Sequence, residues 1–221
     1  FQDTAPQQYR VFRRVYANQP GCGLFLIGDP KQAIYAFRGA DIFTYMQAKD
    51  DSARDGLQYT LGVNWRSGTR LISALNTLFG NARRPFVYDA HIAYHPVDPS
   101  PKADAESLRV DGVEPVPLQF LMLALSETNQ TKRPPGLIRK EAAEAEAAGA
   151  CAERVASLLN LADAGRATLG ERPLAAGDIA FLVRTHREGS LVQKALRERG
   201  VNSVTLSQDS VLASEDAGEL A

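Results

Sequence analysis

The sequence is poor in cysteine, has no long apolar run and carries almost no net charge. Its two cysteines, Cys22 and Cys151, have neither zinc-ligand spacing nor a pairing pattern, which predicts a reduced, cytoplasmic protein. No apolar stretch approaches the ~18 residues of a membrane-spanning helix and no signal peptide is found, so no membrane contact is expected. The formal net charge of −1 gives no support for DNA binding through bulk electrostatics, so any DNA contact must depend on local residues.

The chain nevertheless has enough apolar material to fold. Hydrophobic residues make up 44% of its 221 residues, which suffices for a packed core in one domain or in parts of two. It begins with Phe1 rather than with methionine, and we therefore expect it to be an excised segment of a longer protein.

Strand-like and helix-like segments alternate along the chain. Helical spacing of apolar side chains predicts helices over residues 6–17, 71–79, 148–162 and 185–200. In the last helix, Thr185 and Glu188 can form a capping box and Gly200 stands where a C-terminal cap belongs. Five apolar runs are typical of strands: residues 24–28, 58–63, 117–123, 178–184 and 202–206. This alternation predicts an α/β fold with a largely parallel sheet.

Two stretches fit neither type of element. Residues 83–116 are rich in proline and polar side chains, and residues 126–137 are expected to form an exposed loop. The polar stretch at residues 50–56 is a candidate hinge. A basic cluster is expected to be solvated, with contact to DNA phosphates as the alternative. It consists of Lys132, Arg133, Arg139 and Lys140.

The clearest motif is LIGDPKQAIYAFRGAD at residues 26–41. A buried strand is expected to end at Gly28, with Asp29 as the N-cap and Pro30 as the first residue of a helix. Gln32 is then the third helical residue, at the carboxyl edge of the sheet, where open α/β folds bind ligands. Its amide has both donors and an acceptor, so it can bridge a phosphate oxygen and an attacking water.

Tyr35, Phe37 and Arg38 follow Gln32 closely. Flat aromatic faces beside a guanidinium make a platform for unpaired bases and their phosphates. The residues alone leave a structural alternative open, in which Gln32 completes a capping box with Asp29 and the two rings belong to the core.

This segment resembles motif III of the UvrD/Rep-type helicases of superfamily 1A, whose general form is G-D-x-x-Q-x-I-Y-x-[WF]-R-G-A. The variant present here is most similar to the RecB branch of that family. Two further landmarks lie at suitable distances: FQDT at residues 1–4 resembles the end of motif II, and NWRS at residues 64–67 resembles motif IV. A weaker likeness covers residues 178–185, which are followed by His186 where the family usually has asparagine.

The resemblance implies an ATP site shared by two domains. Gln32 is expected to sense the γ-phosphate from the first domain, and Arg66 to reach it from the second and stabilise charge on the transferred phosphoryl group. A surface ion pair is the alternative for Arg66. ATP and Mg²⁺ are the implied cofactors of the full-length protein. These 221 residues contain neither the phosphate-cradling pattern G-x-x-x-x-G-K-[ST] nor the acidic pair of motif II nor motif VI, so the segment alone is expected to be inactive and to hold neither cofactor.

The resemblance also implies a channel for single-stranded DNA. Phe37 is expected to stack on a base, with Tyr35 and Arg38 supporting the channel. Arg184 and His186 are expected to contact the DNA backbone from the second domain. Trp65 is expected to pack rather than to stack on a base.

The implied fold is RecA-like, the P-loop NTPase type, with a parallel sheet and flanking helices in parts of two helicase domains. Residues 1–55 would end the first domain, and residues 56–221 would form the first half of the second, before an inserted 2B domain. The implied function is that of an ATP-dependent helicase and exonuclease subunit. Such a subunit translocates on single-stranded DNA and unwinds and degrades double-strand ends in recombinational repair, alongside RecC- and RecD-like subunits. An AddA- or UvrD-type helicase and a helicase-like scaffold without ATPase activity are the alternatives.

Overall fold

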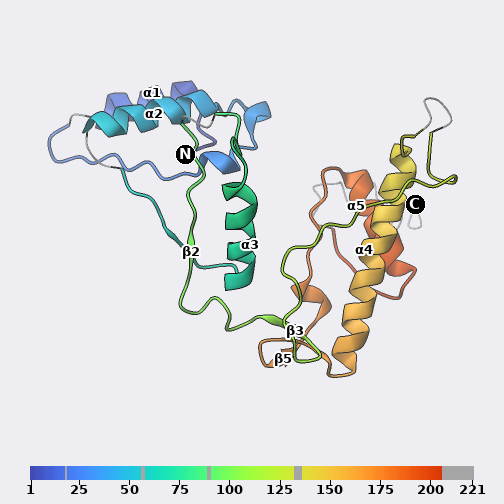
Figure 1. Cartoon of the computed structure of the whole chain (residues 1–221). Helices are drawn as coiled ribbons and strands as arrows, with labels where there is room; N and C mark the ends of the chain where they lie inside the picture. Colours follow the sequence, from blue (N-terminus) through green and yellow to red (C-terminus); the bar gives the residue numbers. More distant parts are fainter. Residues whose placement is uncertain (18, 56–57, 89–90, 132–135, 206–221) are drawn as a thin grey trace, which may run out of the picture. The chain divides into compact units, whose positions relative to one another are not determined.

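The computed structural model describes residues 1–17, 19–55, 58–88, 91–131 and 136–205. They belong to two compact units, Phe1–Lys102 and Ala103–Ala221, each of which is considered by itself (Figure 1). The predicted boundary between two helicase domains near residue 55 is a different division, which stays a prediction.

Unit 1 combines three helices with a short parallel strand pair. Strands β1 (Val63–Asn64) and β2 (Asp98–Pro99) pair with Val63 opposite Asp98, and helix α3 (Thr69–Gly80) forms the crossover between them. The other helices are α1 (Pro6–Tyr16) and α2 (Ile42–Asp55), and two single turns of 3₁₀-helix lie between these, η1 (Pro30–Gln32) and η2 (Ala36–Arg38). Helices α1 and α3 confirm the helices predicted at residues 6–17 and 71–79.

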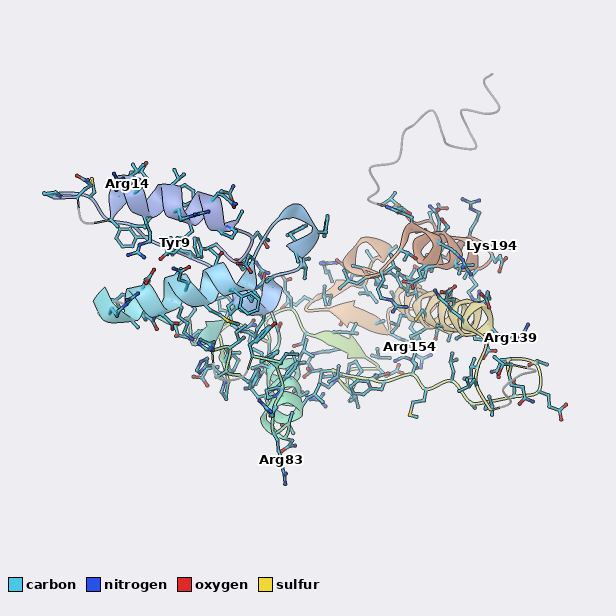
Figure 2. All side chains as sticks on the ribbon, turned by 90° about the horizontal axis from the view of Figure 1, so that it is seen from above. Tyr9, Arg14, Arg83, Arg139, Arg154 and Lys194 are labelled. Carbon is cyan, nitrogen blue, oxygen red and sulfur yellow. The ribbon has the colours of Figure 1, made fainter. Side chains whose placement is uncertain are left out.

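Helices α1 and α2 lie side by side (Figure 1). Tyr9 is the buried residue of α1, and Figure 2 shows it between the two helices. Its hydroxyl donates to the buried carboxylate of Asp51 at 2.9 Å, which also accepts from Arg13 and Arg54. A buried polar cluster therefore joins these two helices.

Unit 2 is built on two packed helices and a small antiparallel sheet. Strands β3 (Leu108–Val110), β4 (Ala167–Leu169) and β5 (Arg172–Pro173) pair in the order β3-β4-β5. Helix α4 (Lys140–Asp163) packs against α5 (His186–Arg197), and η3 (Ala176–Asp178) is a single 3₁₀ turn between β5 and α5. Small residues allow the two helices to approach closely, because the core between them includes Ala148, Ala152 and Ala195.

Helix α5 has the N-cap residue and the C-terminal glycine that its sequence predicts. The Thr185 hydroxyl accepts a hydrogen bond from the Glu188 backbone N–H at 3.2 Å, as an N-cap should. At the other end Gly200 has a φ of 73°, and the Val201 N–H donates to the Leu196 carbonyl at 3.0 Å. A left-handed glycine at this position relieves the strain that a side chain would cause.

The predicted strands are largely absent. Among the described residues of those five runs, Val63 alone lies in a strand, and Leu206 lies outside the described range. Many apolar side chains of these runs are consequently solvent-exposed, to between 83% and 100% for Phe25, Ile27, Leu61, Met122 and Leu182. Because a strand needs a hydrogen-bonded neighbour, an apolar run forms no ladder where that neighbour is missing. A mixed α/β chain is confirmed, whereas parallel pairing within the described ranges is limited to β1 and β2.

The two stretches predicted to lack elements are partly ordered. Residues 83–116 contain β2 and β3, so the prediction of no element there is wrong. Residues 126–137 are not simply an exposed loop, since Asn129 is only 2% exposed, accepts from the Ser126 N–H and donates to the Ala124 carbonyl.

The predicted basic cluster is only partly described. Lys132 and Arg133 lie outside the described residues. Arg139 donates to the Thr128 carbonyl at 2.6 Å, and Lys140 lies 3.7 Å from Glu144. Both described members of the cluster therefore have partners within the protein.

Candidate nucleotide and DNA site

The segment before Gln32 passes very close to the start of the chain. A Cβ on Gly28 would lie 2.8 Å from the Gln2 side-chain oxygen and 3.0 Å from the Gln2 nitrogen. The Phe1 amino group donates to the Ile27 carbonyl at 2.7 Å. Glycine at position 28 is required because only a residue without Cβ permits this approach.

Asp29 organises the turn that carries Gln32. Its carboxylate accepts from the Lys31 backbone N–H at 3.0 Å and lies 2.8 Å from the Lys31 ammonium. The Gln32 side-chain Nε2 donates to the second carboxylate oxygen at 3.1 Å. Partial burial raises the pKa of Asp29, but the hydrogen bonds from Lys31 and Gln32 and the Lys31 charge outweigh it, so the net pKa is lowered.

Gln32 therefore does not complete a capping box with Asp29. In a capping box the Gln32 oxygen would accept from the Asp29 N–H, but that N–H donates to Gln2 Oε1 at 3.3 Å. Gln32 is also the last residue of a 3₁₀ turn rather than the third residue of a longer helix. The turn leaves Gln32 exposed at the surface.

The aromatic side chains that follow lie at the surface rather than in the core. Phe37 is 78% exposed and Tyr35 is 38% exposed, with their ring centroids 6.0 Å apart at an angle of 53°. The alternative that places both rings in the core is therefore wrong for this structure. Arg38 ends η2, and its side chain lies outside what the structure describes.

Arg66 follows β1 in a tight polar turn. The Asn64 side-chain oxygen accepts from the backbone N–H groups of Arg66 and Ser67, each at 2.9 Å. This Asx turn directs the chain from β1 to α3 and leaves Arg66 exposed. Trp65, which was predicted to pack, is 72% exposed because the same turn carries it to the surface.

Arg184 and His186 lie in unit 2, where the chain enters α5. The Glu188 carboxylate accepts from the Arg184 backbone N–H at 2.8 Å and from its guanidinium at 3.0 Å. These hydrogen bonds, with the Arg184 charge, lower the pKa of Glu188. The Arg184 side chain remains 85% exposed, and His186 is an exposed first residue of the helix.

The predicted site residues thus fall into two sets. Gln32, Tyr35, Phe37, Arg38 and Arg66 belong to unit 1, whereas Arg184 and His186 belong to unit 2. Within unit 1 the structure pairs the two aromatic rings and ties Gln32 to Asp29. A shared ATP site of Gln32 with Arg66, and a DNA path across both sets, stay predictions.

Sequence reasoning did not find the contact of Gln2 with Asp29. The two residues are 27 positions apart, and the local signal was Gly28, whose missing side chain allows another segment to come close.

No group of three or more His, Cys, Asp or Glu side chains within the described ranges is arranged to hold a metal ion. None of the helices described is both long enough and apolar enough to cross a membrane.

Comparison with known proteins places these motifs in a family. Residues 1–53 match the family described as UvrD/REP helicase N-terminal domain. The whole chain is 39% identical to the RecBCD enzyme subunit RecB of Escherichia coli (strain K12) and 36% identical to that of Buchnera aphidicola subsp. Acyrthosiphon pisum (strain APS). The subunit of Mycobacterium tuberculosis (strain ATCC 25618 / H37Rv) is 35% identical over 98% of the chain. The chain spans 18% of the length of each of these three relatives.

Proposed function

We propose, from the premise that this chain belongs to the RecB family of UvrD/REP helicases, that it forms part of an ATP-dependent DNA helicase motor. One observation carries the proposal. A single short segment of unit 1 presents the exposed amide of Gln32 and, five residues later, the exposed ring of Phe37. A polar group suited to phosphate and a ring suited to a base are thereby held in one piece of backbone.

We propose that the fold is RecA-like, with residues 1–55 in the first helicase domain and residues 56–221 in the second. The exposed apolar runs support it, because continuous apolar runs are typical of strands buried on both faces of a parallel sheet. The predicted strands at residues 24–28 and 178–184 then pair with strands supplied by the remainder of the full-length protein.

Gln32 and Arg66 are the residues of this segment that fit the phosphates of ATP. Both side chains are exposed, and each offers N–H donors to phosphate oxygens, in fork geometry for the arginine. When bound with Mg²⁺, ATP supplies the phosphoanhydride bond whose cleavage powers the motor. The Mg²⁺ ligands are then supplied by residues beyond this segment.

The DNA contacts that we propose divide between the units. In unit 1, Phe37 stacks on an unpaired base, and Tyr35 and Arg38 support the channel for the strand. In unit 2, Arg184 and His186 contact the phosphate backbone, for which the largely exposed Arg184 guanidinium is suited. ATP-dependent closure of the two domains would then shift the grip on the strand.

The substrate and partners that we propose follow from the relatives. Those proteins are named as the RecB subunit of the RecBCD enzyme, so we propose that the full-length protein unwinds and degrades double-strand DNA ends in recombinational repair with RecC- and RecD-like subunits. The whole-chain matches to RecB subunits favour this over an AddA- or UvrD-type helicase. The exposed Gln32 and Arg66 favour an active motor over a scaffold.

Substitution of Gln32 in the full-length protein tests the proposal. Gln32→Ala should retain binding of a fluorescent ATP analogue and lose most DNA-stimulated ATP turnover and unwinding, since it removes a group that orients the reacting water. Gln7→Ala, an exposed glutamine on α1, is the matched control and should behave as the unmodified protein. Parental turnover in Gln32→Ala would contradict the assignment.

A further inference from the structure

We propose that Asp29 is a positioning residue that sets the orientation of the Gln32 amide, an inference that rests on the function proposed above. The Gln32 Nε2 donates to one oxygen of the Asp29 carboxylate at 3.1 Å. The amide oxygen is thereby the atom left to face an attacking water. Asp29 acts through Gln32 and has no proposed contact of its own with nucleotide or DNA.

The charge of Asp29 decides which end of the amide faces it. An ionised carboxylate only accepts hydrogen bonds, so it attracts the NH₂ end of a glutamine and repels the oxygen end. The pKa of Asp29 is lowered, despite partial burial, by the bonds from Lys31 and Gln32 and by the Lys31 charge, which keeps the group ionised at neutral pH. The opposite amide orientation would place two oxygen atoms against each other.

Three contacts hold Asp29 in place. Its first carboxylate oxygen accepts from the Lys31 N–H and pairs with the Lys31 ammonium. Its backbone N–H donates to Gln2 Oε1, and the absence of a side chain on Gly28 makes room for Gln2 there. A side chain fixed in this way can transmit a fixed orientation to its neighbour.

The orientation has a chemical consequence at the site. The dihedral that turns a glutamine amide is broad and roughly two-fold, so an unrestrained Gln32 would sample both orientations. One orientation offers an acceptor to the water and the other offers donors, and only an acceptor can draw a proton of the water away from the phosphate. Removing the restraint should therefore slow the chemical step more than it weakens nucleotide binding.

Asp29→Asn separates this role from helix capping. Asparagine caps a helical turn about as well as aspartate, and its one oxygen can keep the bond to the Lys31 N–H. The other end of its side chain becomes an NH₂ group that no longer accepts from Gln32. In the full-length protein, kcat for DNA-stimulated ATP hydrolysis should fall ~10²-fold, as for a misplaced reacting group. The KM for ATP should change far less.

The matched control is a second capping aspartate in the same unit. Asp41 accepts from the backbone N–H groups of Phe43 and Thr44 at the start of α2, so Asp41→Asn makes the same chemical change away from Gln32. It should leave kcat unchanged. Asp29→Ser is a second test variant, because serine also caps the turn but has one oxygen on a shorter side chain, and it should reproduce the loss of kcat.

A double-substitution cycle distinguishes failure of this inference from failure of the proposed function. If Asp29 acts through Gln32, the Asp29→Asn/Gln32→Ala protein should be no slower than Gln32→Ala alone. Parental turnover in Gln32→Ala contradicts the role proposed for Gln32. A slow Gln32→Ala together with a parental Asp29→Asn and Asp29→Ser, or with losses that multiply in the double variant, overturns the positioning role of Asp29.

Discussion

At Phe37 the motif context and the exposure of the ring together argue for a function. The ring is 78% exposed although the chain has buried positions for apolar side chains, and Tyr35 lies beside it. An exposed ring contributes little to folding stability, so its replacement should affect binding rather than the fold.

Phe37→Ala in the full-length protein should weaken single-strand binding by ~1–3 kcal/mol, the usual contribution of one stacked base. DNA-stimulated ATPase and unwinding should fall with it, while the melting temperature changes little. Phe37→Trp keeps a flat π-face and should stay active. A large fall in melting temperature with unchanged DNA affinity would instead show that Phe37 has a structural role, because loss of a core phenylalanine costs about 3–5 kcal/mol of folding free energy.

Local chemistry made some of these residues predictable and left others hidden. Asp29 and Thr185 are oxygen-bearing side chains directly before a helical turn, and both act as N-caps as their sequence context predicts. The bond from the Asp29 N–H to Gln2 depends on how the chain folds back, and its one local signal, Gly28, does not identify the partner. The orientation of the Gln32 amide was not predicted either, because it depends on the hydrogen bond from Gln32 Nε2 to the Asp29 carboxylate.

Helices α1 and α2 depend on one buried carboxylate. Asp51 accepts from Tyr9 and Arg13 of α1 and from Arg54 of its own helix. The Asp51 carboxylate thus accepts hydrogen bonds from three side chains, and it is itself almost fully buried. It is therefore the polar contact on which the pairing of the two helices depends.

Asp51→Ala should destabilise the α1–α2 pair by about 1.5–3 kcal/mol, the range for hydrogen bonds to a charged group, while Tyr9→Phe should cost about 1 kcal/mol. Hydrogen exchange of the α1 amides in the full-length protein measures both effects. Asp50→Ala removes the neighbouring, more exposed carboxylate and serves as the control. Equal protection of α1 in Asp51→Ala and Asp50→Ala would contradict this role.

The stability of the 3₁₀ turn η3 should fall in acid. Two hydrogen bonds from the Arg172 guanidinium and one from the Ala175 N–H hold the pKa of Asp178 at about 2, below its ordinary value of 3.8. The stability that this lowered pKa provides is present above pH 3.8 and is lost as the pH falls toward 2. Hydrogen exchange of residues 172–180 should show the loss, and Arg172→Met should reduce its dependence on pH. An unchanged acid profile in that variant would exclude the ion pair as the cause.

Helices and strands differed in how far the sequence determined them. The spacing of apolar residues within one segment predicts α1, α3, α4 and α5, because a helix satisfies its backbone hydrogen bonds internally. A strand satisfies them with another segment, so the apolar run at residues 24–28 shows strand composition without forming a ladder. The antiparallel sheet of unit 2 went unpredicted because its strands have only two or three residues each.

Charge is distributed unevenly over the whole molecule, although the net value is near zero. Residues 1–102 contain twelve Lys and Arg against eight Asp and no Glu, whereas residues 103–221 contain thirteen against eighteen acidic residues. Unit 1 is therefore positive and unit 2 negative. The positive charge of unit 1 is consistent with the ATP phosphate contacts proposed for Gln32 and Arg66, whereas the DNA phosphate contacts proposed for unit 2 must depend on Arg184 and His186 themselves.

The 221-residue chain on its own should not hydrolyse ATP. It contains no G-x-x-x-x-G-K-[ST] pattern to cradle the phosphates, so Gln32 and Arg66 alone cannot bind and activate the nucleotide. A steady-state assay with single-stranded DNA and Mg²⁺ checks this. DNA-stimulated turnover that purifies with the chain and disappears in its Arg66→Ala variant would contradict the prediction.

DNA-stimulated ATP turnover by the full-length protein carrying Arg66→Ala shows whether this segment belongs to a helicase motor. If Arg66 reaches the γ-phosphate, ATP binding should be retained and turnover should fall ~10³-fold or more, as when an arginine finger is lost. Arg66→Lys should restore only part of the rate, because lysine lacks the planar fork. Arg83→Ala, which removes an exposed arginine that points away from α3 (Figure 2), should keep the parental rate. Parental turnover and unwinding in both Arg66 variants would contradict the account of this segment as part of a helicase motor.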